Sequence, residues 1–327
     1  MAELHIHLEG TLEPELIMSL AQKNGISLPY TDLADLRSRY EFTDLQSFLD
    51  LFYANMIVLR TSQDFHDITM AYLARAHDSG VRHVELFFDP QAHVERGIGL
   101  TEVISGIREA LREGEERWGI SHKLIACFWR HAPALEALDL LKILVEQKHD
   151  IDGIGLDSSE LGFPPELFQE VFEYAREHGL HVVAHAGEEG PAEYIWQALD
   201  LLKVQRVDHG IRCLDDEQLV QRLVAEQMPL TVCPLSNVRL RAVDTMAEHP
   251  LPLMLARGLN VSIHSDDPAY FGGYLDANVA ALNEHFSFTT EQWAKLAANS
   301  FEAAFLDEQQ RAGRLAEVAS WQASQSA

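Results

Sequence analysis

Short apolar segments alternate with longer amphipathic segments along most of the chain. Eight short segments are typical of buried strands, at 3–8, 83–88, 123–129, 153–156, 181–186, 206–209, 229–233 and 260–264. Between them, segments such as 100–118, 165–179 and 216–227 repeat apolar residues at helical spacing. Strands that alternate with helices predict a parallel sheet. Eight such units in about 265 residues predict an α/β fold of the (β/α)8 type, the TIM barrel.

The segment between the first two predicted strands holds several predicted helices, including 45–59. Within it, Phe48, Leu49 and Phe52 recur at helical spacing. This stripe is typical of core packing. However, an insertion after the first strand of a barrel lies over the active-site face, where the stripe could cover an aromatic ligand. We leave both interpretations open, and we expect one barrel domain over 1–327 with a peripheral helix or tail at about 307–327.

The composition narrows the classes of partner. Hydrophobic residues make up 47% of the chain, and no apolar stretch is long enough to predict a membrane span. The net charge of −26 opposes binding to a nucleic-acid backbone and favours a small neutral or cationic substrate. The first ten residues lack the pattern of a signal peptide, and the three cysteines form no C-x-x-C pair. We therefore expect a cytoplasmic protein that binds neither nucleic acid nor membrane, and we leave a homodimer open.

Metal-ligating and acid/base residues stand at the ends of four predicted strands. His5 and His7 lie two apart in ELHIHLEG, so both side chains face one side of a strand. The fifth, sixth and eighth strands end in HAGEEG, DHG and SDDP, which contribute His185, Glu188, His209, Asp266 and Asp267. Because barrel chemistry collects at the C-terminal strand ends, we expect one shared site.

Four of these residues form a candidate metal site. His5, His7, His185 and Asp266 offer three ring nitrogens and one carboxylate, a set suited to Zn2+ with a position left for water. The same set also suits iron or manganese. The fourth strand, GIGLDSSE, has no lysine that could bridge two metals, so we expect one ion per subunit.

The other residues are candidates for proton transfer and substrate binding. Glu188 stands three residues after a ligand and is the expected general acid. His209 is expected to hold or deprotonate the attacking water, with Asp208 orienting its ring. Asp267 is expected to contact a ring nitrogen of the substrate. The alternatives are a solvated charge at a helix start for Glu188 and turn formation before Pro268 for Asp267.

The segments AELHIHLEG, HAGEEG, DHG and SDDP, in this order, resemble the adenosine/adenine deaminase family of the amidohydrolase superfamily. The resemblance covers about 2 to about 306, and PLTVCPLSN and DDPAYFGGY are most similar to its adenine deaminase branch. It implies that zinc activates a water that attacks C6 of a purine. It also implies that Glu188 protonates N1, that His209 assists the water, that Asp266 ligates zinc and that Asp267 binds N7.

Two departures from the nucleoside deaminases of this family predict a free base as the substrate. Nucleoside deaminases carry an aspartate that helps to hold the ribose, where this chain has Glu9. We expect the longer side chain to fill ribose space and to accept an N–H of the base; the alternative is a conservative exchange. Ser158 stands where those enzymes place a glycine beside the purine, and with Asp157 it offers polar contacts to the base.

The resulting hypothesis is a zinc-dependent deaminase that converts adenine to hypoxanthine and ammonia in purine salvage. The alternatives in the same class act on N6-substituted adenines or on adenosine. A catalytically silent, metal-bearing binding protein is the alternative of another class, and the presence of every expected chemical group disfavours it. His264 also faces the barrel interior, and we expect a buried layer residue there more than a partner of a metal ligand.

Overall fold

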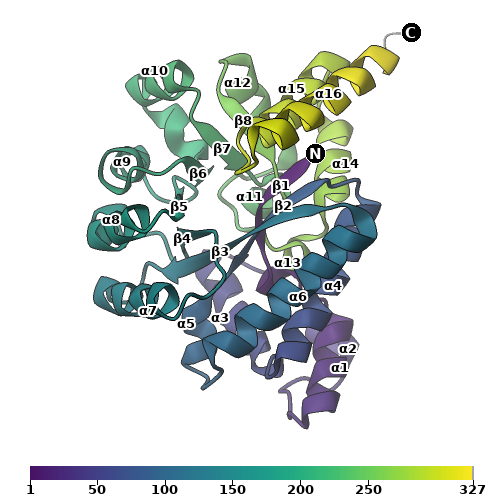
Figure 1. The fold of residues 1–327 in the computed structure, drawn as a ribbon. Helices are drawn as coiled ribbons and strands as arrows, with labels where there is room; N and C mark the ends of the chain where they lie inside the picture. The colour runs from purple at the N-terminus through teal and green to yellow at the C-terminus, as the bar shows by residue number, and fades with distance from the viewer. Residues whose placement is uncertain (326–327) are drawn as a thin grey trace.

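The computed structural model describes residues 1–325 and contains a barrel of eight parallel strands surrounded by helices (Figure 1). The strands are β1 (Ala2–His7), β2 (His83–Phe88), β3 (Ser121–Trp129), β4 (Gly153–Asp157), β5 (His181–Ala186), β6 (Arg206–His209), β7 (Pro229–Val232) and β8 (Asn260–Ile263). Each strand pairs with the next one in the chain. The predicted (β/α)8 barrel is confirmed, and every predicted strand is present.

The first and last strands close the barrel through a few hydrogen bonds. The amide of His7 donates to the carbonyl of Asp266 over 3.1 Å, and the amide of Asp266 donates to the carbonyl of His5 over 3.0 Å. Deeper in the barrel, the amide of Leu4 donates to Nδ1 of His264 over 3.0 Å. His264 is thus a buried residue that joins β8 to β1, and its ring contacts no candidate metal ligand through a hydrogen bond among the described residues.

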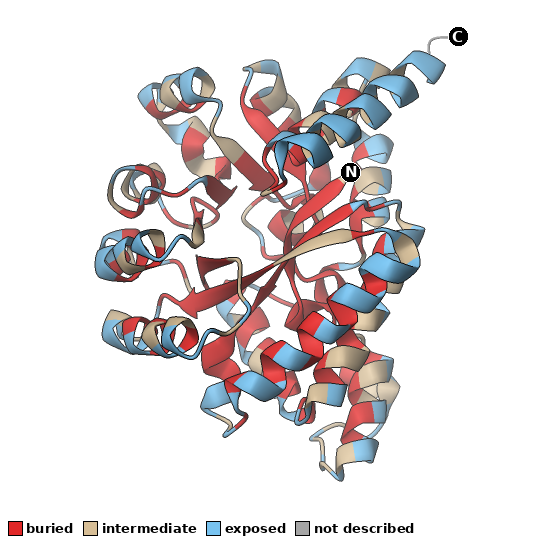
Figure 2. Cartoon of the chain, in the orientation of Figure 1, coloured by how far each residue is buried: buried red, intermediate tan, exposed pale blue. Residues whose placement is uncertain are grey.

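The helices surround the strands and bury one side of each against them. They are α4 (Ser62–Asp78), α5 (Pro90–Val94), α6 (Leu100–Trp118), α7 (Ala134–Glu146), α8 (Gln169–Glu177), α9 (Ala192–Gln197), α10 (Glu217–Glu226), α11 (Pro234–Arg239), α12 (Leu251–Ala256), α13 (Pro268–Phe271), α14 (Leu275–His285), α15 (Thr290–Glu302) and α16 (Glu308–Gln325). Figure 2 shows buried strands and helices whose inner sides are buried and outer sides exposed. No helix within residues 1–325 is long and apolar enough to span a membrane.

Local sequence signals set several helix ends. The side chain of Thr61 accepts the amide of Asp64, and the Asp64 side chain returns the bond, so α4 begins with a capping box. The same reciprocal pattern starts α15. Helix α6 ends at Gly119, whose φ of 69° is the left-handed conformation that glycine adopts without strain. These caps fix where each crossover returns to the barrel.

The predicted insertion after the first strand consists of α1 (Pro14–Asn24), α2 (Leu33–Ser38) and α3 (Leu45–Asn55). Helix α3 packs against α13, which follows β8. The ring of Phe48 lies 5.4 Å from that of Tyr270 and 4.6 Å from that of Phe271, centroid to centroid. The insertion therefore lies across the C-terminal ends of the strands, as expected.

The C-terminal helix α16 packs on α15 and has no buried residue in its described part. It corresponds to the peripheral segment expected at about 307–327, of which residues 326–327 lie outside the described residues. In Figure 1 this helix projects away from the barrel, at the opposite end of the view from α1 and α2. It contributes no residue to the site described below.

Candidate active site

The four predicted metal ligands lie together at the C-terminal ends of β1, β5 and β8. Their ligand atoms all lie within 4.8 Å of one another, and all four residues are buried. Nε2 of His7 lies 3.2 Å from Nε2 of His185. Oδ1 of Asp266 lies 3.3 Å from Nε2 of His5 and 3.4 Å from Nε2 of His7. Three strands therefore direct one donor set to one point.

These separations fit a divalent ion. Ligand atoms about 2.0–2.1 Å from a tetrahedral zinc ion lie about 3.3 Å from one another. Nε2 of His5 is buried without a hydrogen-bond partner, as expected of a donor that needs an ion. Burial lowers the pKa of His7 to about 4 and that of His185 well below its usual range, so both rings are neutral and can ligate a metal.

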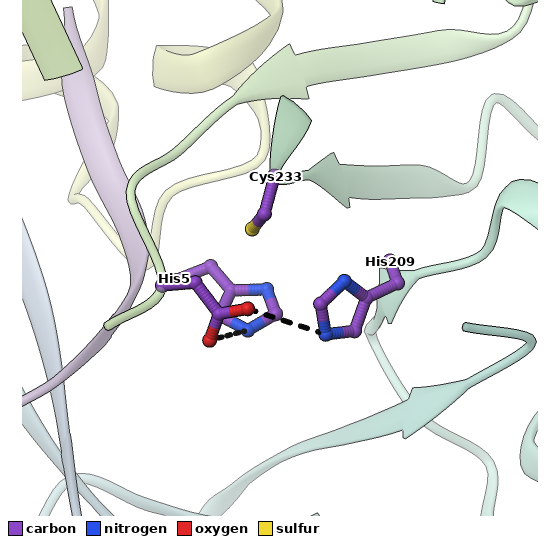
Figure 3. A group of neighbouring side chains, drawn as sticks. His5, His209 and Cys233 are labelled. Carbon is purple, nitrogen blue, oxygen red and sulfur yellow. Dashed lines mark ion pairs between the residues drawn. The ribbon is translucent and has the colours of Figure 1, made fainter. Parts of the chain in front are cut away.

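A second group of potential ligands overlaps the first. It contains His5, His209, Cys233 and Asp266. In Figure 3, dashed lines join the rings of His5 and His209 to one carboxylate, and the Cys233 side chain lies nearby. These are the ion pairs of Asp266 with His5 and His209, over 3.3 Å and 3.7 Å. Burial raises the pKa of the Cys233 thiol well above its usual range, so the sulfur is protonated and a poor ligand. The set of three histidines and one aspartate is the better metal site.

Carboxylates lie behind the ligand histidines. Oδ2 of Asp208 lies 3.7 Å from Nδ1 of His185, and its Oδ1 accepts the hydroxyl of Thr231 over 2.7 Å. The Thr231 hydroxyl in turn lies 3.0 Å from Nδ1 of His5. Oδ2 of Asp157 lies 3.6 Å from Nδ1 of His7. Such partners fix the tautomer and orientation of a ligating ring.

Asp208 therefore differs from its expected place beside the ring of His209. The Nδ1 atom of His209 instead lies 3.4 Å from the side-chain amide of Asn237. Asp208 is held from below by the buried Arg206, whose Nε lies 3.4 Å from Oδ1 and whose other nitrogens reach Glu85 and the carbonyl of Leu4. Through these contacts, Arg206 connects Asp208, which lies behind the candidate metal ligands, to the interior of the barrel.

Two site residues have a left-handed backbone. The φ angles are 63° at His209 and 62° at Asp266, both outside the usual range for residues with a Cβ. The turn breaks the alternation of the strand, so that Asp266 and Asp267 both line the same pocket. Such strain, on the order of 1–3 kcal/mol per residue, is typical of functional sites.

Gly10, the last residue of the ELHIHLEG segment, lies where no side chain would fit. A Cβ at this position would lie 2.0 Å from Oδ1 of Asp267. Only a residue without a side chain lets the Asp267 carboxyl group approach the β1 loop so closely. The loop after β1 and the loop after β8 therefore form one wall of the pocket together.

Glu188 and His209 face each other across the pocket. Oε2 of Glu188 lies 3.4 Å from Nε2 of His209, and Oε1 of Glu188 is buried without a hydrogen-bond partner. Burial and the nearby carboxylates of Asp266 and Glu160 raise the pKa of Glu188 well above its usual range. Burial lowers the pKa of His209 to about 3. These shifts favour a proton on Glu188 and a neutral ring at His209.

The pocket is closed on one side by the insertion. The apolar residues that line it are Leu45, Phe48, Leu49, Phe52, Tyr53 and Leu240, and all but Leu240 belong to α3. The apolar stripe of α3 is therefore both buried and pocket-lining, so both interpretations drawn from the sequence hold. Its aromatic faces suit a flat ring system.

Ser158 lines the pocket, whereas Glu9 does not. Oγ of Ser158 lies 3.1 Å from the Tyr53 hydroxyl and 2.9 Å from Nδ1 of His131, and its φ of 73° is one that glycine favours. Oε1 of Glu9 accepts Nε2–H of His93 over 2.6 Å and the amide of Asp89 over 3.2 Å. Glu9 was expected to contact the substrate. In the structure its carboxylate instead makes contacts behind the pocket wall, because His93 donates a hydrogen bond to it.

Glu160 is a residue that the sequence did not single out. Its carboxylate accepts the backbone amides of Gly187, Glu188, Glu189 and Gly190 over 2.6–3.1 Å. Arg130 supports the same loop by donating to the carbonyl of His185 over 2.7 Å. The only available signal was a glutamate shortly after the fourth strand. One side chain thus fixes the loop that carries Glu188.

Replacing Glu160 with Gln is expected to lower kcat by about 10- to 100-fold and stability by about 2 kcal/mol. The amide NH2 cannot accept a hydrogen bond, so at least one loop amide becomes an unpaired buried donor. Steady-state kinetics and thermal unfolding measure the two effects, with the exposed Glu166→Gln as the control. A folded variant with wild-type kcat would contradict a positioning role.

The adenosine deaminase family model matches residues 1–321. That range includes every strand and every pocket residue described above. The chain belongs to the adenosine deaminase family.

Relatives within this family agree in sequence and in fold. An adenine deaminase of Ectopseudomonas mendocina is 56% identical over 92% of this chain and 96% of its own length. The crystal structure of an adenine deaminase from Arthrobacter aurescens is 57% identical, covers 98% of both chains and superposes with a TM-score of 0.97. An amidohydrolase from Burkholderia ambifaria with bound Zn is 28% identical over 99% of this chain and 92% of its own, with a TM-score of 0.88.

Proposed function

We propose that this chain deaminates adenine with water to give hypoxanthine and ammonia. In this reaction a C6–O bond forms, the C6–N bond to the exocyclic amino group breaks, and that group leaves as ammonia. The observation that carries the proposal is a buried glutamate facing a buried histidine beside a group of four potential metal ligands, in a pocket lined by aromatic rings. Relatives named adenine deaminase at 56–57% identity over nearly the whole chain support the same substrate.

The donor set fits one Zn2+ per chain, held by His5, His7, His185 and Asp266. When bound, such an ion lowers the pKa of water and so supplies a nucleophile near neutral pH. The Zn-bound relative at 28% identity supports this metal. Iron and manganese also accept this donor set, so the preferred ion is a matter for measurement.

Glu188 is the proposed general acid. Its protonated carboxyl group can donate to N1 of the purine, which makes C6 more electrophilic. The unpartnered Oε1 leaves one carboxyl oxygen free for that contact. The Gly187–Gly190 loop, held by Glu160, sets the direction of the side chain.

His209 is the proposed partner of the attacking water. A neutral Nε2 can accept a proton from that water, and it lies 3.7 Å from Oδ2 of Asp266. Asn237 holds the other face of the ring through Nδ1. The contact leaves Nε2 pointing into the pocket, and acceptance of a proton there requires the ring hydrogen on Nδ1 with the side-chain oxygen of Asn237 turned toward it.

Asp267 is the proposed contact to N7 of the purine. Its Oδ1 is buried without a partner, and burial together with the charge of Asp266 raises its pKa well above the usual range. A protonated carboxyl group can donate to the lone pair of N7. Together, Glu188 and Asp267 would hold the two ring nitrogens on either side of C6.

We place the enzyme in the cytoplasm, in a salvage reaction for purine bases. The described helices include no candidate membrane span, and the three cysteines are free and buried. Free buried thiols are typical of a reducing compartment. The homodimer stays a prediction, which the mass of the protein in solution would test.

Adenine is expected to exceed adenosine in kcat/KM by about four orders of magnitude, because a site shaped for the N9–H edge rejects an analogue that lacks it. N6-isopentenyladenine keeps that edge and is expected to react more slowly than adenine because of the bulk on its amino group. A spectrophotometric assay of the metal-loaded protein measures the three substrates side by side. A better rate with the N6-substituted base would move the biological role to modified purines. A better rate with adenosine would contradict selection of the free base.

A further inference from the structure

Two carboxyl groups in the pocket are not used by the steps above. Asp89 follows β2 and Asp157 ends β4, and both are buried and line the pocket. Neither Oδ1 atom accepts a hydrogen bond from an N–H or hydroxyl donor of the described residues, although the two carboxyl groups lie close enough to share a proton. Buried acceptors left unpaired are costly, so a ligand that donates to them is the expected partner.

The carboxyl group of Asp89 is held in one orientation. Its Oδ2 accepts Nε1–H of Trp129 over 2.9 Å and the hydroxyl of Tyr53 over 3.3 Å. Its backbone amide donates to Oε1 of Glu9 over 3.2 Å. With Oδ2 fixed by two donors, Oδ1 is the atom left for the pocket.

The expected pose of the base puts its far edge against this wall. Glu188 and Asp267, which would hold N1 and N7, follow β5 and β8 on one half of the barrel. Asp89 and Asp157 end β2 and β4 on the other half, with the ligand His7 of β1 within 4.8 Å of both carboxyl groups. The edge of adenine that stays free in this pose carries N3 and N9–H.

We infer that Asp89 selects the free base by accepting the N9–H of adenine at Oδ1. This inference rests on the proposed function and adds the residue that reads the edge opposite the reacting carbon. A nucleoside carries a sugar on N9, so it has no hydrogen to donate there. It would leave the Asp89 oxygen buried and unpaired and would drive the sugar into the wall of Tyr53 and Trp129.

Glu9 then affects substrate selection only indirectly, through its contact with Asp89. Arg96 lies 2.5 Å from Nδ1 of His93, His93 donates from Nε2 to Glu9, and Glu9 accepts the amide of Asp89. This relay runs from Arg96, two residues after the end of α5, to the backbone of Asp89. Glu9 is therefore a positioning residue for the selecting carboxylate, which accounts for a glutamate that does not reach the pocket.

The test compares adenine with 9-methyladenine, in which a methyl group, the smallest carbon substituent, replaces the hydrogen on N9. The wild-type enzyme is expected to prefer adenine by about 10⁴-fold in kcat/KM. In Asp89→Asn, the oxygen of the amide keeps the Trp129 and Tyr53 contacts and its NH2 faces N9–H. The preference for adenine is therefore expected to fall by about 100-fold, mostly through loss of adenine turnover.

A control and a second measurement separate the possible outcomes. Asp50→Asn makes the same change on the exposed face of α3 and should keep the wild-type preference. Calorimetric binding of hypoxanthine and 9-methylhypoxanthine should show the same loss of discrimination in Asp89→Asn without turnover. An unchanged preference in a folded Asp89→Asn variant would overturn the role of Asp89. Absence of adenine turnover in the wild type would instead overturn the proposed function.

Discussion

Replacing Glu188 with Gln is expected to lower kcat for adenine by at least about 1,000-fold while leaving one metal ion per chain. Gln has nearly the same shape and can hydrogen-bond to N1, but it has no acidic proton to transfer. General acid catalysis contributes about 10²- to 10⁴-fold, and an uncharged N1 also leaves C6 less electrophilic. Ammonia release measures the rate, and elemental analysis of the purified variant measures the metal content.

The neighbouring Glu189→Gln is the matched control. Glu189 shares the loop held by Glu160 but is absent from the pocket lining, so its variant should deaminate adenine at nearly the wild-type rate. If Glu188→Gln released ammonia as fast as the wild type, another group would supply the proton. If it lost the metal as well, the effect on rate would no longer report on acid catalysis.

Removal of the metal is expected to abolish deamination, and addition of one equivalent of Zn2+ is expected to restore it. Without an ion, nothing at the site lowers the pKa of water by the several units that attack at C6 needs. The ion should also raise the unfolding temperature, because it binds the folded ligand set and not the unfolded chain. Dialysis against a chelator, followed by titration with Zn2+, Fe2+ or Mn2+, measures both effects.

Two variants tell the overlapping ligand groups apart. Cys233→Ser is expected to keep the ion and the activity, because a protonated thiol is not a ligand. His7→Ala is expected to lose both, since His7 belongs to the preferred set of three histidines and one aspartate and not to the group that contains Cys233. Loss of the ion from Cys233→Ser would favour the group that contains the sulfur. Full activity of metal-free protein would contradict the proposed chemistry.

Much of the fold followed from the sequence because barrel strands leave a strong local signal. Segments such as HVELFF and HVVAHA are buried on both faces and read as continuous apolar runs, which parallel strands require. The histidines of the proposed metal site could also be found from the sequence, because functional residues of a barrel lie at the C-terminal ends of its strands. His5 and His7 could be paired from their spacing alone.

Other features of the site depend on contacts between distant segments. No local pattern indicated that His93 would bond to Glu9, because 84 positions separate them. Nor did any pattern show that left-handed backbone at His209 and Asp266 would let consecutive residues face the same space. Glu160 was missed because its partners are backbone amides, which every residue carries. Such contacts are visible only once the segments have been placed.

The seam between β1 and β8 also has a consequence for how the protein folds. The contact between Leu4 and His264 spans 260 residues, and closing a loop of that length costs on the order of 5 kcal/mol of chain entropy. His7 and Asp266 lie on the two sides of this seam, so the proposed ligand set is complete only once the barrel has closed. An ion bound there would join the first and last strands and would stabilise the closed barrel against opening at the seam.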